Sequence, residues 1–212
     1  MRLSFLHTGD IHVATFEALA ADLGFDGVVS HRVEQHLLDR AREQGVNAVR
    51  GDTLAVLEEL ADADAVLCTC STIGPLTDEM AARAKNIIRI DRPALSAACS
   101  YGGRPAVAMC LESTRAPTLA LLAECASDAG VEVSPRVIMC EDAWPFFEAG
   151  DLDAFAARIA ETVRAGVGDA DCVVLAQASM RVAEAALCDL GAPVITTPRL
   201  AVERAIAVAR GG

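Results

Sequence analysis

Two stretches of the sequence repeat each other at one fixed spacing, and this repeat most constrains the fold. Segment 62–73 aligns without a gap on 169–180, and segment 88–98 aligns on 195–205, both at an offset of 107 residues. Four of 12 and four of 11 aligned positions are identical. The alternative is that any strand–helix unit resembles any other. Because two separate segments share one offset, we expect two related halves within the 212 residues.

Short aliphatic runs alternate with longer Ala-, Leu- and Glu-rich segments of helical period, which predicts βαβ units and parallel sheets. The expected strands are 2–6, 27–29, 47–49, 65–68, 87–90, 106–111, 132–139, 172–175 and 193–196. The expected helices are 15–23, 34–43, 53–61, 76–84, 118–129, 152–165, 180–190 and 200–209. In open parallel sheets, ligands bind outside the carboxyl ends of the strands, so the loops that follow strands are the candidate sites.

Composition and charge exclude several classes of protein. The chain is 53% apolar but only 4% aromatic, which predicts an aliphatic core and argues against disorder. A net charge of −12 repels phosphate backbones and argues against nucleic-acid binding. No apolar run approaches the roughly 18 residues of a membrane span, and the first residues do not form a signal peptide. We therefore expect a cytoplasmic protein with no membrane partner.

Eight cysteines in such a compartment are not expected to form disulfides. Cys68 and Cys70 lack zinc-ligand spacing, and a redox sensor built on this pair would require an exposed Cys68. Cys70 follows a predicted strand and precedes a helix, where backbone N–H groups favour a thiolate nucleophile or base. The alternative is a buried cysteine before an ordinary Ser/Thr helix cap. Five other cysteines lie in apolar surroundings and are expected to act as small hydrophobes, at positions 99, 110, 125, 172 and 188.

At these residues the sequence resembles a known family. The run VLCTCSTIG, with C-S-T at 70–72, is similar to the first cysteine motif of the aspartate/glutamate/hydantoin racemases, and VVLAQASM at 173–180 is similar to their second motif. The runs LHTGDIHVATFEAL and LESTRAPTLALLAE resemble the segments that open each lobe. The resemblance implies an α/β protein of two pseudo-symmetric, flavodoxin-like lobes with a cleft between them. Lobe 1 would be 1–103 plus about 198–212, and lobe 2 would be 104–197.

The second motif departs from the family at one position, where Gln177 stands in place of the second catalytic cysteine. Glutamine has no titratable proton, so we expect chemistry with Cys70 as the one base or nucleophile. The resemblance implies a cofactor-independent isomerase acting on a small carboxylate such as an amino acid or hydantoin. The alternatives are a one-base decarboxylase or cis–trans isomerase, and a binding protein without catalysis. No dinucleotide or P-loop motif appears, and we expect neither metal nor pyridoxal phosphate.

Substrate contacts are expected from the loops that follow predicted strands. His7 and His31 could carry protons, and Arg32 could hold a carboxylate with two hydrogen bonds. By the resemblance, Thr114 and Ser179 would bind the polar head of the substrate. The full set of expected substrate-binding residues is His7, Thr8, His31, Arg32, Ser71, Thr72, Ser113, Thr114, Thr118, Glu141, Ala178 and Ser179. Ala-rich helices also permit a homodimer.

Overall fold

The computed structural model describes residues 1–211 and contains two compact units. Unit 1 comprises Met1–Ile90 together with Pro198–Gly212, and unit 2 comprises Asp91–Thr197. The division falls at residue 90, whereas the sequence places it at 103, because a helix that the sequence pattern did not predict, α5 (Arg92–Ala98), packs within unit 2. Within the described residues, no helix combines the length and the apolar character that crossing a membrane requires.

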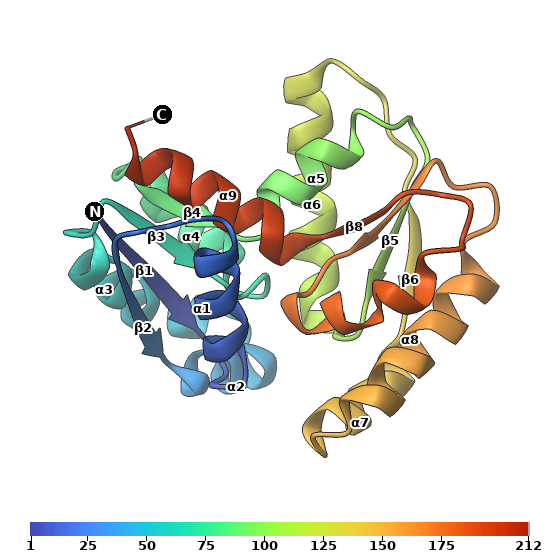
Figure 1. The fold of residues 1–212 in the computed structure, drawn as a ribbon, viewed down its shortest axis with the longest axis horizontal. Coiled ribbons are helices and arrows are strands. Elements are labelled where there is room, and N and C mark those ends of the chain that lie inside the picture. The colour runs from blue at the N-terminus through green and yellow to red at the C-terminus, as the bar shows by residue number, and fades with distance from the viewer. Residues whose placement is uncertain (212) are drawn as a thin grey trace. The chain divides into compact units, whose positions relative to one another are not determined.

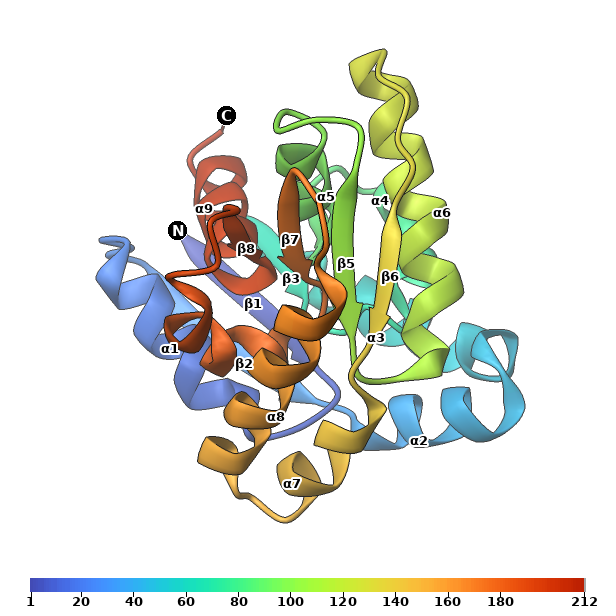
Figure 2. The ribbon, with the colours of Figure 1, turned by 90° about the vertical axis from the view of Figure 1, so that its right-hand side faces the viewer.

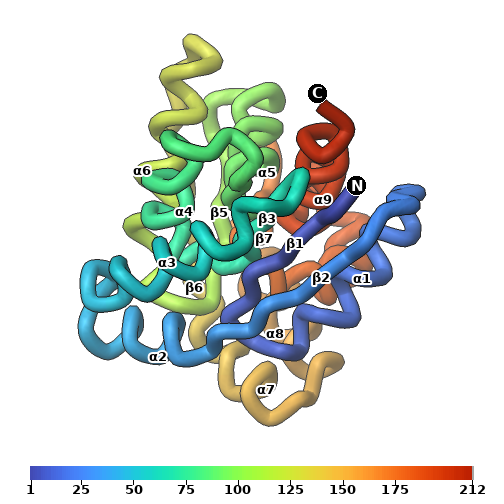
Figure 3. The backbone as a smooth tube through the Cα atoms, turned by 90° about the vertical axis from the view of Figure 1, so that its left-hand side faces the viewer, coloured from blue at the N-terminus to red at the C-terminus, as the bar shows by residue number. Residues whose placement is uncertain are grey.

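Unit 1 is built on a four-stranded parallel sheet with strand order β2-β1-β3-β4 (Figure 1). Figure 3 follows this unit as a tube, with β1 between β2 and β3. Every residue of β3 is buried, as expected for a parallel strand covered on both faces. The strands are β1 (Arg2–His7), β2 (Val28–Val33), β3 (Ala65–Cys68) and β4 (Ile87–Arg89). The helices are α1 (His12–Asp22), α2 (Gln35–Gln44), α3 (Arg50–Leu60), α4 (Gly74–Ala81) and most of α9 (Thr197–Ala209).

Unit 2 repeats this topology with strand order β6-β5-β7-β8, and Figure 2 shows β7, β5 and β6 side by side. Helix α8 buries Phe155, Ile159 and Val163 at helical spacing in the core, and Asp151 caps its first turn by accepting a hydrogen bond from the N–H of Ala154. The strands are β5 (Pro105–Met109), β6 (Arg136–Met139), β7 (Cys172–Leu175) and β8 (Val194–Thr196). Besides α5, the α-helices of unit 2 are α6 (Glu112–Ala129), α7 (Trp144–Glu148) and α8 (Leu152–Gly166).

The structure confirms the predicted α/β class with two related parallel sheets. Strand β7 lies 107 residues after β3, and β8 lies 107 residues after β4, which is the offset found in the sequence. Each pair occupies the same place in its sheet. The repeat is therefore a repeat of topology as well as of residues.

Two local predictions are wrong. The expected strand at 47–49 is a 3-10 helix, Val46–Val49, because Gly45 ends α2 with φ of +86° and the chain then continues directly into α3. The expected helix at 180–190 is two short 3-10 helices, Ala178–Ala183 and Ala185–Leu187. The apolar spacing that predicted it serves equally for 3-10 turns, in which every third residue faces inward.

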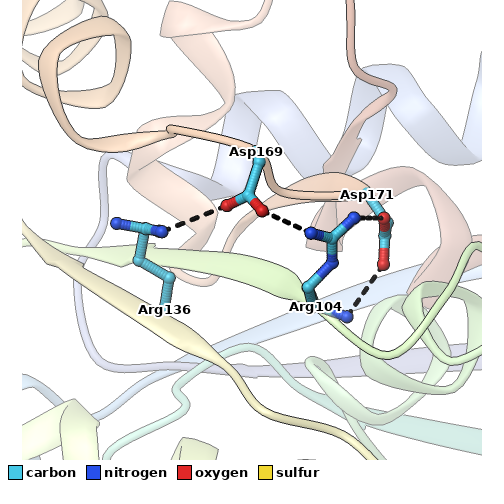
Figure 4. Close-up of polar contacts among 4 residues, drawn as sticks. All are labelled: Arg104, Arg136, Asp169 and Asp171. Atoms are coloured by element: carbon cyan, nitrogen blue, oxygen red, sulfur yellow. Dashed lines mark hydrogen bonds and ion pairs between the residues drawn. The ribbon is translucent and has the colours of Figure 1, made fainter.

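The amino ends of the strands in unit 2 are tied together by ion pairs (Figure 4). The backbone N–H and Nη2 of Arg104 lie 2.9 and 3.0 Å from the carboxylate oxygens of Asp171. Asp169 pairs with Arg104 and, at 3.2 Å, with Arg136. A pocket of about 470 Å³ opens here, lined by Arg104, Ser134, Pro135, Arg136, Asp169 and Ala170. Both arginines are neutralised by these aspartates, so this edge of the sheet holds the strands in register.

The Arg104–Asp171 pair predicts a pH-dependent loss of stability. Hydrogen bonds from Arg104 lower the pKa of Asp171 below its ordinary value of 3.8. The contribution of this carboxylate to stability is therefore complete above pH 3.8 and is lost as the pH falls through the depressed pKa. We expect Asp171→Asn to lower the urea midpoint at neutral pH, with the difference from wild type shrinking in acid. Asp142→Asn, at an exposed carboxylate of the same unit, is the control. A difference that is constant with pH would contradict this assignment.

Candidate active site

Cys70 lies in a short buried loop between β3 and α4. Strand β3 ends at Cys68, and the loop turns through a hydrogen bond from the N–H of Gly74 to the carbonyl of Ser71, 3.1 Å away. Only 8% of the Cys70 surface is exposed, and its neighbours Ser71 and Thr72 are also buried. Gly74 is required at the start of α4 because a Cβ there would collide with the buried Arg89 guanidinium.

The environment of the Cys70 sulfur contains two opposing influences. Burial raises the pKa of Cys70, whereas hydrogen bonds from the Thr8 hydroxyl, the Thr72 hydroxyl and the N–H groups of Thr72 and Ile73 lower it. Burial is the larger influence, so the pKa lies above its ordinary value. The sequence predicted a thiolate at this helix N-terminus, and the structure corrects this to a resting thiol whose anion has four donors to stabilise it.

Burial is the largest influence on the pKa of five other cysteines. Burial raises the pKa of Cys140 to about 12 and that of Cys172 to about 11. Cys99, Cys110 and Cys125 are also buried, as predicted, and burial raises the pKa of each of these thiols.

Two cysteines bear on the alternative roles weighed from the sequence. All eight cysteines are free thiols. The redox-sensor hypothesis requires an exposed Cys68, and Cys68 is fully buried, which contradicts that hypothesis. Cys188 is exposed, contrary to its predicted apolar environment, because it follows a short 3-10 helix in which Leu187 is the residue that turns inward. Among the described residues, no group of three or more His, Cys, Asp or Glu side chains could hold a metal ion.

Gln177 occupies in unit 2 the position that Cys70 occupies in unit 1. Each lies two residues beyond the equivalent strand, β7 or β3. The Gln177 side-chain oxygen accepts hydrogen bonds from the N–H groups of Cys110, at 2.5 Å, and Leu111, at 3.2 Å. The strand registers make Cys110 the counterpart of Thr8, because each lies two residues beyond the strand position that pairs with the end of β7 or β3. Both units therefore link the same two loops, but only unit 1 does so through a thiol.

The histidines and Arg32 do not follow their strands as predicted, because β1 and β2 extend to His7 and Val33. His7 is fully buried, and its two ring nitrogens contact Thr69 and His31. Both nitrogens of its ring are therefore engaged within unit 1. Arg32 is exposed on the edge strand and pairs with Glu34 at 2.6 Å, a contact that raises the pKa of Arg32.

The predicted contacts of unit 2 divide into a buried and an exposed group. Thr114 and Thr118 are buried near the start of α6, and the Thr118 hydroxyl has no hydrogen-bond partner within the described structure. Ser179 is buried beyond β7, whereas Ser113 and Ala178 are half-buried. Glu141 is exposed at the start of a 3-10 helix, away from the interior.

The structure adds two residues that the sequence analysis missed. Thr69 bonds to His7, and Glu17 on α1 bonds to His31. Thr69 could have been suspected from its place beside Cys70. No motif marks Glu17, because its role depends on the packing of α1 against β2.

Two units of one topology, each carrying a polar loop beyond a buried strand, define a duplicated α/β protein. The sequence matches the Asp/Glu/Hydantoin racemase family over residues 11–205. The chain therefore belongs to this family.

Solved structures share the fold at low sequence identity. An aspartate racemase from Picrophilus torridus is 15% identical, with a TM-score of 0.66 over 99% of this chain and 94% of that one. A glutamate racemase isoform from Bacillus anthracis is 16% identical, with a TM-score of 0.72 over 99% and 81%. An arylmalonate decarboxylase is 15% identical, with a TM-score of 0.60 over 100% and 94%. No curated protein sequence matches the chain.

The donors around Cys70 predict the effect of removing one of them. Thr8→Val deletes a hydroxyl that stabilises the thiolate, so we expect the Cys70 pKa to rise further, with about tenfold less thiolate at a given pH. The pH dependence of Cys70 alkylation, followed by mass spectrometry of its peptide, measures this change. Thr53→Val is the matched control, because the Thr53 hydroxyl is buried without a partner. Equal Cys70 alkylation profiles in the two variants would contradict the assignment.

Proposed function

We propose that this protein is a cofactor-independent enzyme that uses Cys70 to move a proton at the carbon next to a carboxylate. The single observation that carries this proposal is the set of four donors around the Cys70 sulfur. A thiol that served only as packing would need no such donors. The substrate class is a small acid such as an amino acid, or a hydantoin, in which the ring carbonyl takes the place of the carboxylate and accepts the electron pair; both match the family to which the chain belongs. Reducing conditions in the cytoplasm would keep Cys70 a thiol.

The proton transfer is reversible at one residue. The resting Cys70 thiol first passes its proton to solvent water, and the thiolate then takes the α-proton: the C–H bond breaks, an S–H bond forms, and the electron pair moves into the carboxylate as an enediolate. Return of the proton from the same sulfur regenerates the substrate. We assign the backbone N–H and the hydroxyl of Ser71 to the substrate carboxylate, because the N–H and the hydroxyl of Thr72 donate to the Cys70 sulfur.

Gln177 determines the stereochemical outcome of this scheme. Racemization by two bases needs a second group that gives or takes a proton, and a glutamine amide does neither at ordinary pH. The Gln177 oxygen is already used by the N–H groups of Cys110 and Leu111. We therefore propose that Cys70 exchanges protons on one face of the carbon.

A second reaction is favoured by the raised pKa of Cys70, which makes the resting residue a proton donor. In a decarboxylation, the C–C bond breaks, CO₂ leaves without the electron pair, and the pair remains on the enediolate. The Cys70 S–H then donates its proton to carbon, and the thiolate recovers one from water. This reaction needs one proton donor and no second base, which suits a chain with glutamine at 177.

Hydrogen exchange in D₂O tests the proposal with a panel of amino acids, hydantoins, malonates and maleate. We expect α-proton exchange without loss of optical activity for one of the first two classes, or CO₂ release from a malonate. Cys70→Ser should reduce either rate at least about 10³-fold, because a hydroxyl is a far weaker acid than a thiol, so it is a poorer proton donor and forms almost none of the anion that would act as the base.

Cys110→Ser is the matched thiol control, since Cys110 is buried without a comparable set of donors, and it should retain activity. Gln177→Cys should raise the ratio of racemization to exchange by supplying a second thiol. Racemization by the wild type would overturn the one-base scheme. No turnover of any panel member, together with a Cys70 as unreactive as the other thiols, would favour a binding protein.

A further inference from the structure

A continuous chain of hydrogen bonds runs through unit 1 from the surface of α1 to the residue before Cys70. Glu17 Oε2 lies 2.7 Å from Nε2 of His31, and Nδ1 of His31 lies 2.9 Å from Nε2 of His7. The other nitrogen of His7, Nδ1, lies 2.8 Å from the hydroxyl oxygen of Thr69. An exposed carboxylate is thereby connected to the loop that carries the thiol.

The direction of each bond follows from the two ends of the chain. The Thr69 hydroxyl donates its one proton to the carbonyl of Leu6, 3.1 Å away, so it accepts from Nδ1 of His7. Burial lowers the pKa of His7 to about 3, so His7 is neutral at pH 7 and its Nε2 accepts from Nδ1–H of His31. The Glu17 carboxylate only accepts. His31 therefore donates from both nitrogens, and it can make both of these hydrogen bonds only as an imidazolium.

The two rings are held in place by aromatic packing. His31 stacks on Phe5 with ring centroids 5.1 Å apart, and His7 stacks on His31 at the same distance. Phe16 from α1 lies 5.4 Å from His7, and both phenylalanines are fully buried. Rotation of either imidazole would break both this packing and its hydrogen bonds.

One further titratable ring faces His7. His12 on α1 has its centroid 6.4 Å from that of His7, and burial lowers the pKa of His12 to about 4, with Asp10 opposing the shift. His12 is therefore neutral at pH 7.

We propose that Glu17, His31 and His7 are positioning residues that fix the Cys70 thiol for proton transfer. This inference rests on the proposed function of Cys70. His7 and Thr8 are adjacent, as are Thr69 and Cys70, so two dipeptides are cross-linked: His7 bonds to Thr69, and Thr8 bonds to Cys70. The first link aligns the backbones so that the second can form. The N–H of Thr69, 2.9 Å from the carbonyl of Leu6, adds a third bond.

Glu17→Gln tests this role without disturbing the core, because Glu17 lies on the surface. The variant keeps the side-chain shape but removes the charge that retains the second proton on His31. We expect kcat for exchange or decarboxylation to fall about tenfold with KM within about twofold, as for a misaligned reacting group. Asp22→Asn makes the same change of charge at an exposed site of the same helix and should leave both parameters unchanged.

A second measurement does not depend on turnover. In ¹⁵N-labelled protein at pH 7, histidine NMR should show His7 protonated at Nδ1 only and His31 at both nitrogens, and Glu17→Gln should remove one proton from His31. The same variant should change the Cys70 alkylation rate about tenfold, unlike Asp22→Asn. His7 protonated at Nε2, or a Glu17→Gln variant with unchanged Cys70 alkylation, would overturn the inference. If the wild type turns over no substrate, the proposed function fails, while these two readouts still decide the positioning role.

Discussion

A parallel strand covered on both faces has no place for polar side chains along its length, and this constraint organises the whole molecule. Strands β3 and β7 are buried at every residue, so polarity is confined to their ends. At the amino edge of unit 2, the polar groups are arginines and aspartates that neutralise one another. At the carboxyl edges lie a thiol, hydroxyls and an amide, whose bonds are directed and whose protons can be exchanged. The burial of both faces of the sheet therefore confines these polar groups to the carboxyl edge.

Duplication of the topology has not produced duplicated chemistry. In unit 1, the side chain beyond β1 reaches the thiol beyond β3, so that Thr8 donates to Cys70. In unit 2, the bond runs in the same sense, from Cys110 to Gln177, but the donor is a main-chain N–H and the acceptor is an amide oxygen. The same link between equivalent loops ends on a thiol in one unit and on an amide oxygen in the other. A fold that is symmetric in its backbone therefore supports an asymmetric set of proton donors.

The sequence predicts those features that depend on local pattern and on the repeat. The strand limits 65–68 and 172–175 are confirmed, and each is a continuous apolar run that directly follows an aspartate. Cys70 is found as a candidate because it follows such a run. The histidine chain is not predictable in this way, because it depends on the register that places His31 opposite Phe5 in the ladder of β1 and β2. The sign of the Cys70 pKa shift is also missed, since burial depends on packing that no motif records.

The two hydrogen bonds to the Gln177 oxygen have an entropic consequence. The N–H groups of Cys110 and Leu111, the first beyond β5, donate to this oxygen. Without it, they would need water or an anionic ligand as the acceptor. The loop there is therefore ordered by the protein itself, and its conformational freedom is lost during folding rather than on association. A ligand that contacts this loop meets a surface already in its final shape, so more of its contact energy remains as affinity.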